Sequence, residues 1–244
     1  MPLDYTGFIL ILLSGLIIMA LSYTLDRVWA AAFPMRFLYL FLRAPGVILH
    51  ECAHIAGCIL TGARIQKVTL FSREGGSVHY SRPLIPWIGD VIIGTAPLFL
   101  LPLVLLLITG IFSTWLGCIF PAFPQSIFSF DAFILLWEGI SYTIRENLVT
   151  RFNGWFILYL YLTVSIVLSV APSSQDIKNA TVGIFLLTLC AGMIIWADIS
   201  ILNFLLAELM RLLEIGFTLG LVYGSMALVI SSPLIIWYAY RCRS

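Results

Sequence analysis

Long apolar runs separated by short polar stretches make up most of the chain. Each run approaches the roughly 20 residues that an α-helix needs to cross the hydrocarbon core of a bilayer. The fourth run is the weakest, because Asp131 and Glu138 interrupt it. The pattern predicts an all-α polytopic membrane protein with about six to seven transmembrane helices. The seven runs cover residues 7–24, 45–62, 91–117, 126–144, 152–171, 179–203 and 215–240.

Residues 63–82 follow a different pattern. They hold four of the thirteen Lys and Arg residues of the chain, a Gly75–Gly76 pair, and an alternation in which Val78 and Tyr80 are separated by polar residues. Such alternation beside a glycine pair is typical of a β-hairpin. Because open sheet edges cannot face lipid, we expect this hairpin at the membrane interface or shielded within the protein.

Composition strengthens the membrane interpretation. Hydrophobic residues make up 61% of the 244 residues and charged residues only 10%, whereas soluble domains carry about 25% charged residues. We therefore expect residues 1–244 to form a single integral membrane domain surrounded by the lipid bilayer. The net charge of +1 and the lack of a Lys/Arg cluster indicate that nucleic acid is not a partner. The five cysteines are scattered, several of them in apolar runs, and are expected to be free thiols.

The candidate chemistry lies in the second apolar run, where residues 50–54 read His-Glu-Cys-Ala-His. On a helix predicted to run over 45–62, starting at Pro45, His50 and His54 lie one turn apart on one face, so that two imidazoles can bind one ion. Glu51 lies about 100° further round the helix, within reach of a water on that ion. Zinc lowers the pKa of such a water to about 7 and polarises a carbonyl group, while the glutamate transfers the proton.

Chance is a poor explanation of this motif. With three His and six Glu in 244 residues, about 0.001 copies are expected per chain. Each polar side chain inside an apolar membrane helix also costs roughly 1–3 kcal/mol or more. We therefore interpret His50 and His54 as zinc ligands and Glu51 as catalytic. By helix rise from Pro45, His50 would lie about 7 Å below the nearer membrane face.

The motif and its surroundings resemble the site-2 protease family of intramembrane zinc metalloproteases, with an HExxH helix early in a small polytopic protein and a Gly-Gly hairpin after it. The resemblance implies a third zinc ligand, an aspartate near the start of a later transmembrane helix, usually in an Asn-Pro…Asp-Gly context. Within the segment 172–179, Asp176 follows Pro172 by four residues and has no glycine after it. The resemblance therefore points to Asp176 as the third ligand, in a divergent member of the family.

Other interpretations of the third ligand stay open. Ser173 and Asp176 also fit a capping box, which by itself would explain the acid. Asp131 follows a proline-containing stretch at 121–124 that resembles the family's aspartate region, and His79 could complete a three-histidine site.

The hairpin offers a place for substrate. Proteases commonly bind a peptide as an added strand, and we expect that docking at Gly75, Gly76 and Val78, with an ordinary interfacial loop as the alternative. Asn179, one turn after Asp176, is a candidate to contact the tetrahedral oxyanion.

These features predict a zinc-dependent intramembrane endopeptidase that hydrolyses a transmembrane protein or peptide. His50, His54 and Asp176 would bind Zn²⁺, and Glu51 would act as general base and then as general acid.

Two alternatives to this function remain. One is another class of membrane zinc protease, whose third ligand would be a glutamate such as Glu138 or Glu208. The other is a non-enzymatic zinc-binding membrane protein such as a transporter. Replacement of Glu51 separates the classes, because a transporter should tolerate it and a protease should not.

Overall fold

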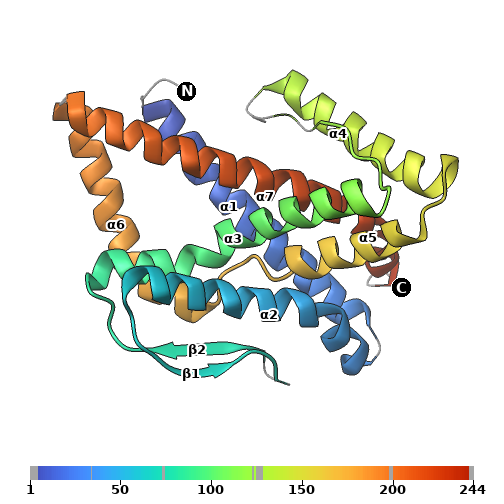
Figure 1. The fold of residues 1–244 in the computed structure, drawn as a ribbon, viewed down its shortest axis with the longest axis horizontal. Helices are drawn as coiled ribbons and strands as arrows, with labels where there is room; N and C mark the ends of the chain where they lie inside the picture. The colour runs from blue at the N-terminus through green and yellow to red at the C-terminus, as the bar shows by residue number, and fades with distance from the viewer. Residues whose placement is uncertain are drawn as a thin grey trace.

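The computed structural model describes residues 5–33, 35–72, 75–122, 124, 129–197 and 200–241. Within these residues the chain forms seven α-helices, a turn of π-helix (Glu146–Thr150) and a two-stranded sheet (Figure 1). The helices are α1 (Tyr5–Ala32), α2 (Arg36–Thr61), α3 (Pro86–Trp115), α4 (Phe130–Arg145), α5 (Gly154–Val167), α6 (Ser174–Ala197) and α7 (Ser200–Arg241), and the strands are β1 (Ile65–Thr69) and β2 (Ser77–Tyr80).

Five of these helices, α1, α2, α3, α6 and α7, are long and apolar enough to cross a membrane by length and composition. Together with the single small sheet, they confirm the predicted fold class. Helices α4 and α5 have only 16 and 14 residues, or about 24 and 21 Å, which is less than the roughly 30 Å of a hydrocarbon core.

The runs 126–144 and 152–171, predicted as full spans, therefore form shorter helices. Residues 125–128 lie outside the described part of the chain. Side-chain caps set where both helices begin: Ser129 Oγ accepts from the N–H of Ala132, and Asn153 Oδ1 accepts from the N–H of Trp155.

Helix α2 is longer than predicted. It begins at Arg36, and Pro45, predicted as its first residue, lies inside it. A proline lacks the N–H that a helix interior needs, but in a membrane helix side chains of a neighbouring helix can satisfy the freed backbone groups. Here α5 supplies such side chains. Gly62 closes the helix in the left-handed conformation, with φ of 69°, which suits a glycine C-cap.

The connection between α5 and α6 passes through the interior. Leu168 and Ser169 are buried although they lie outside regular helix. Non-helical backbone at membrane depth is tolerated only where protein covers it and its polar groups have partners. The N–H of Ala171 donates to Ser22 Oγ at 3.0 Å, and the carbonyl of Ser169 lies 2.6 Å from His50 Nδ1. The predicted run to residue 171 therefore ends early because its last residues bond to other helices.

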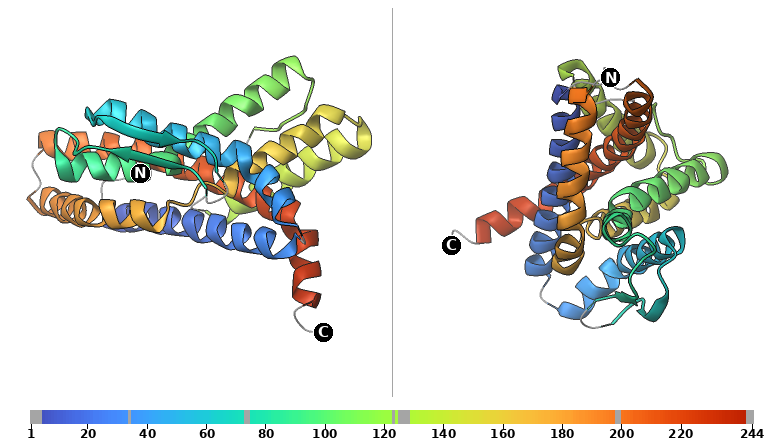
Figure 2. Two further views of the ribbon diagram at one scale, coloured as in Figure 1. Left: turned by 90° about the horizontal axis from the view of Figure 1, so that it is seen from below. Right: turned by 90° about the vertical axis from the view of Figure 1, so that its left-hand side faces the viewer.

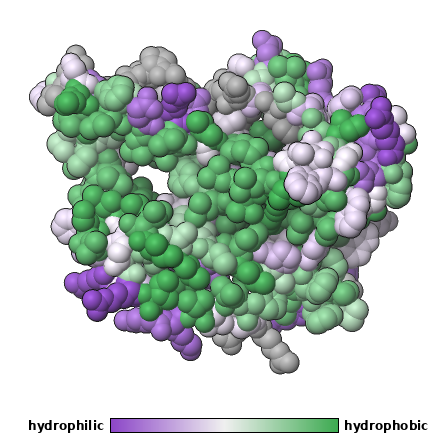
Figure 3. All heavy atoms as spheres, in the orientation of Figure 1, coloured by the Kyte–Doolittle hydropathy of each residue, from purple (hydrophilic) through white to green (hydrophobic). Residues whose placement is uncertain are grey.

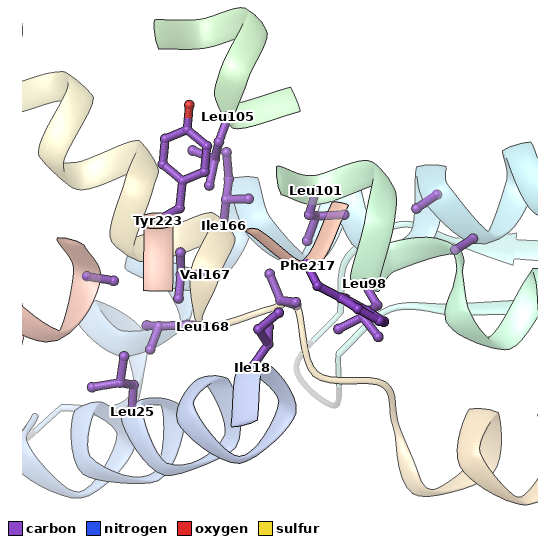
Figure 4. Close-up of a cluster of buried hydrophobic side chains, with 14 of the residues drawn as sticks. Ile18, Leu25, Leu98, Leu101, Leu105, Ile166, Val167, Leu168, Phe217 and Tyr223 are labelled. Atoms are coloured by element: carbon purple, nitrogen blue, oxygen red, sulfur yellow. The ribbon is translucent and has the colours of Figure 1, made fainter. Parts of the chain in front are cut away.

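Helix α3 lies at the centre of the packing. It contacts α2, α5, α6 and α7, while α1 packs along α7, and Figure 2 shows this arrangement from two further directions. The largest cluster of buried apolar residues draws on α1, α3, α5 and α7. Figure 4 shows side chains of this cluster, among them Ile18, Leu101, Val167 and Phe217, gathered between the helices.

Helix α6 is the least covered of the five spanning-length helices. Its buried residues are Ala180, Gly183 and Ala191, whereas large apolar side chains such as Phe185 and Trp196 are exposed. Apolar residues cover most of the face shown in Figure 3. A helix that is apolar on all sides is suited to lipid rather than to water.

The hairpin lies alongside α2 (Figure 1). Its strands are antiparallel, with Val68 opposite Val78 and Lys67 opposite His79. The side chains of Val78 and Tyr80 pack against a buried cluster of Cys58, Ala63 and Ile93. The hairpin is thus covered by the protein on one face.

Candidate metal centre

His50 and His54 lie on the buried face of α2, one turn apart. Their Nε2 atoms are 3.0 Å from each other. Asp176, in the first turn of α6, places its Oδ2 at 3.5 Å from His54 Nε2 and at 4.0 Å from His50 Nε2. Two histidines predicted as ligands and the aspartate predicted as the third therefore meet at one point.

Both imidazoles are oriented by backbone carbonyl groups. His50 Nδ1 lies 2.6 Å from the carbonyl oxygen of Ser169, and His54 Nδ1 lies 2.8 Å from that of Ile93. A carbonyl oxygen can only accept, so each Nδ1 must carry the proton and donate it. Each neutral ring then presents the lone pair of its Nε2 to the centre, which is the arrangement of metal-binding histidines.

The two Nε2 atoms could not approach so closely without a partner. Two lone pairs 3.0 Å apart repel each other unless a proton or a metal ion lies between them. Around a tetrahedral ion with ligands at about 2.0–2.1 Å, the ligand atoms lie about 3.3 Å apart. The observed distances of 3.0, 3.5 and 4.0 Å bracket this value. His50, His54 and Asp176 could therefore hold a metal ion.

Glycines bring the helices that carry these residues close together. At Gly57 a Cβ atom would lie 2.9 Å from the Cα of Ile93, whose carbonyl orients His54. At Gly94 a Cβ atom would lie 3.0 Å from the carbonyl oxygen of Asp176. Small residues let membrane helices approach in this way. The positions of the three donor groups thus depend on the close packing of α2, α3 and α6.

Asp176 also caps its own helix. Its Oδ2 accepts a hydrogen bond from the N–H of Ser173 at 2.8 Å, and its own N–H donates to Ser173 Oγ at 3.2 Å. These reciprocal bonds form the capping box predicted from the sequence. The box holds the carboxylate on the side of α6 that faces the histidines, so that capping and metal binding are compatible.

Glu51 is buried beside the pair and is covered by the hairpin. At Gly76 a Cβ atom would lie 2.6 Å from Glu51 Cδ, so that only glycine fits there without displacing the carboxylate. Gly75 has a φ of 112°, in the region that favours glycine. Each residue of the predicted glycine pair therefore has its own reason to be glycine. The side chain of Val78 packs against the buried cluster, and docking of a substrate strand at Gly75, Gly76 and Val78 stays a prediction.

Asn179 connects α6 to the hairpin. Its Nδ2 donates to the hydroxyl oxygen of Tyr80 at 3.4 Å, and its Oδ1 accepts from Gln175 Nε2 at 2.8 Å. Burial raises the pKa of the Tyr80 phenol above its ordinary value, which favours the protonated hydroxyl. The Asn179 amide thus links β2 to α6, and its contact with an oxyanion stays a prediction.

The alternative ligands lie elsewhere. Asp131, Glu138 and Glu208 are exposed on α4 and α7, and His79 is exposed on β2. In the part of the chain that the structure describes, His50, His54 and Asp176 form the only group of at least three His, Cys, Asp or Glu residues close enough to share an ion.

Three contributors to the site were not predicted. The carbonyl groups of Ser169 and Ile93 orient the histidines, and the Tyr80 hydroxyl joins the hairpin to α6. A backbone carbonyl leaves no signal in residue type, so the first two could not be found from the sequence. The apolar–polar alternation that predicted β2 does include Tyr80 and gives its inward direction.

No protein-family model, no curated protein and no solved structure matches this chain. The resemblance to site-2 proteases therefore stands on the motif residues themselves.

Proposed function

We propose that this chain is a multi-pass integral membrane protein and a zinc metalloendopeptidase of the site-2 protease type, which hydrolyses peptide bonds of membrane-embedded proteins or peptides. One observation carries the proposal: His50, His54 and Asp176 converge on one point beside Glu51, and they do so on helices of spanning length.

The donor set favours zinc among the common metals. Two imidazole nitrogens and one carboxylate oxygen provide three protein ligands and leave a fourth position open, as in catalytic zinc sites. Calcium and magnesium prefer oxygen ligands in larger number. When bound, zinc would act as a Lewis acid on the scissile carbonyl group and would make a water molecule more acidic.

Glu51 is the residue that we expect to move the proton. Its carboxylate lies near enough to His54 and Asp176 to interact with both electrostatically. As general base it takes a proton from the attacking water, and as general acid it delivers that proton to the amine that leaves. Burial under Gly76 keeps bulk water from taking the proton between the two steps.

The hairpin supports the assignment to a protease rather than to a transporter. Gly76 brings backbone, without a side chain, directly against Glu51. An extended peptide that pairs with the hairpin through backbone hydrogen bonds would run past this carboxylate. Gly75 and Gly76 are therefore the hairpin residues that we expect closest to a bound substrate.

The test separates zinc binding from proteolysis. The wild-type protein, purified in detergent, is expected to contain about one zinc per chain and to cleave single-span transmembrane peptides until a chelator is added. Glu51→Gln should keep the zinc and lose roughly 10²-fold or more in cleavage rate, because the amide cannot accept the proton.

Glu208→Gln is the matched control. Glu208 is exposed on α7 and pairs with Arg211 at 4.0 Å, so that its replacement should change neither zinc content nor cleavage. Cleavage by Glu51→Gln at the wild-type rate, or a wild-type protein that binds no zinc on reconstitution, would contradict the proposal.

A further inference from the structure

Pro45 interrupts the hydrogen bonding of α2 five residues before His50. Proline has no N–H, so the carbonyl of Phe41, four residues earlier, loses its helical partner. In a lipid environment an unpartnered carbonyl is costly. The structure provides a substitute, because the hydroxyl of Tyr161 on α5 donates to the Phe41 carbonyl at 3.2 Å.

A second side chain of α5 serves the next residue of α2. The N–H of Gly46 donates to Ser165 Oγ at 3.1 Å. At Gly46 a Cβ atom would lie 2.7 Å from the carbonyl carbon of Ser165 and 2.6 Å from Ser169 Oγ. The two backbones are therefore in contact at this point, and only glycine permits it.

Ser169, the third of these hydroxyl-bearing residues, orients a histidine. Tyr161, Ser165 and Ser169 are spaced by four residues, which places them on one side of α5 and of the turn that follows it. The carbonyl oxygen of Ser169 lies 2.6 Å from His50 Nδ1. The Oγ atom of Ser169 is buried and has no hydrogen-bond partner. The contacts at Phe41 and Gly46 thus fix how α2 lies along α5, and this alignment brings His50 to the Ser169 carbonyl.

We infer that Tyr161 and Ser165 are positioning residues of the metal centre. Their hydroxyl groups complete the backbone of α2 around Pro45 and hold α2 against α5, so that the Ser169 carbonyl fixes the tautomer and direction of His50. This inference rests on the metal site of the proposed function. Mutation of a partner that orients a ligating histidine typically lowers metal affinity by 10–100-fold. Mutation of a residue that acts one step further away should lower metal affinity less.

The test is a double-mutant cycle on zinc affinity, measured by competition with a chromogenic chelator on folded protein in detergent. Tyr161→Phe should weaken zinc binding about fivefold to tenfold, because the Phe41 carbonyl loses its donor. Pro45→Ala returns an N–H to α2, which can bond the Phe41 carbonyl within the helix. In the Pro45→Ala background, Tyr161→Phe should therefore change zinc affinity less than twofold, so that the two substitutions are strongly non-additive.

Ser165→Ala and Ser14→Ala form a matched pair that does not depend on the proline. Ser165→Ala removes the acceptor for Gly46 and should weaken zinc binding several-fold. Ser14→Ala removes a hydroxyl that bonds the Leu10 carbonyl of its own helix α1, away from the metal centre, so that zinc affinity should be unchanged. The melting temperature of the zinc-free protein, measured in parallel, reports general loss of stability separately.

The outcomes distinguish this inference from the proposed function. If wild type binds zinc and both Tyr161→Phe and Ser165→Ala bind it equally well, the positioning role is wrong while the metalloprotease proposal stands. The positioning role is also wrong if Tyr161→Phe costs the same affinity with and without Pro45. If wild type binds no zinc, both proposals fall.

Discussion

At the scale of single residues, Asp176 shows how one side chain can serve two purposes. The sequence left a choice between a helix cap and a metal ligand. The structure gives Asp176 Oδ2 a hydrogen bond from Ser173 and places the same atom 3.5 Å from His54 Nε2. A carboxylate has lone pairs for both partners. The capping box therefore orients the carboxylate, as hydrogen bonds to metal-binding side chains commonly do.

Substitutions at this box separate the two purposes. Asp176→Asn should lower zinc affinity by at least about 10-fold, because an amide is a much weaker ligand than a carboxylate. The cap should survive, since Asn caps a helix nearly as well as Asp. Ser173→Ala should do the reverse, with a loss of about 1 kcal/mol in the free energy of unfolding and zinc still bound. Zinc titration and thermal unfolding of both variants provide the measurements, and a fully zinc-loaded Asp176→Asn protein would remove Asp176 from the ligand set.

At the scale of secondary-structure elements, the sequence predicted most where a pattern is local. The HExxH helix, its end at Gly62 and the hairpin at 65–80 all follow from periodicity and glycine chemistry. The start of α2 was misjudged because Pro45 suggests a helix start, and only the side chains of α5 make an internal proline tolerable. The end of α5 was misplaced for a similar reason, since the partners of residues 169 and 171 are distant in sequence. Local propensity contains no information about either contact.

The contact between the hairpin and α2 gives a prediction at this scale. Gly76→Ala introduces a Cβ where the Glu51 carboxyl group lies, so the hairpin or the carboxylate must shift. We expect zinc binding to persist, because the atoms nearest to the added Cβ belong to Glu51 and not to a proposed ligand. Cleavage should fall by about 10-fold or more, since misplacement by about 1 Å can cost 10²-fold. Gly192→Ala on α6 is the control, as a Cβ there meets nothing within 4 Å. Unchanged cleavage in Gly76→Ala would mean that the hairpin does not constrain Glu51.

At the scale of the whole molecule, the longer α2 changes the distance of the site from the helix ends. His50 lies 14 residues after Arg36 and 11 before Thr61, or about 21 and 17 Å from the two helix ends at 1.5 Å per residue. The expectation of about 7 Å was measured from Pro45, whereas α2 begins nine residues earlier, at Arg36. If α2 spans the bilayer, the histidines lie near its middle, where water is scarce. The hairpin, which follows α2 and folds back along it, then covers the half of α2 that leads from Thr61 to the site.

This arrangement predicts that the two ends of α2 lie on opposite sides of the membrane. Met35, between α1 and α2, and Arg82, between β2 and α3, are both exposed, so cysteines introduced there should be accessible. In a background with the five natural cysteines replaced by alanine, Met35→Cys and Arg82→Cys should react with a membrane-impermeant maleimide from opposite faces of sealed vesicles. Retained zinc binding by the cysteine-free protein is the control for its fold, and detergent-opened vesicles, in which both positions should react, control for accessibility. Reaction of both cysteines from the same face of sealed vesicles would show that α2 does not cross, and the metal centre would then lie at the membrane surface rather than within the bilayer.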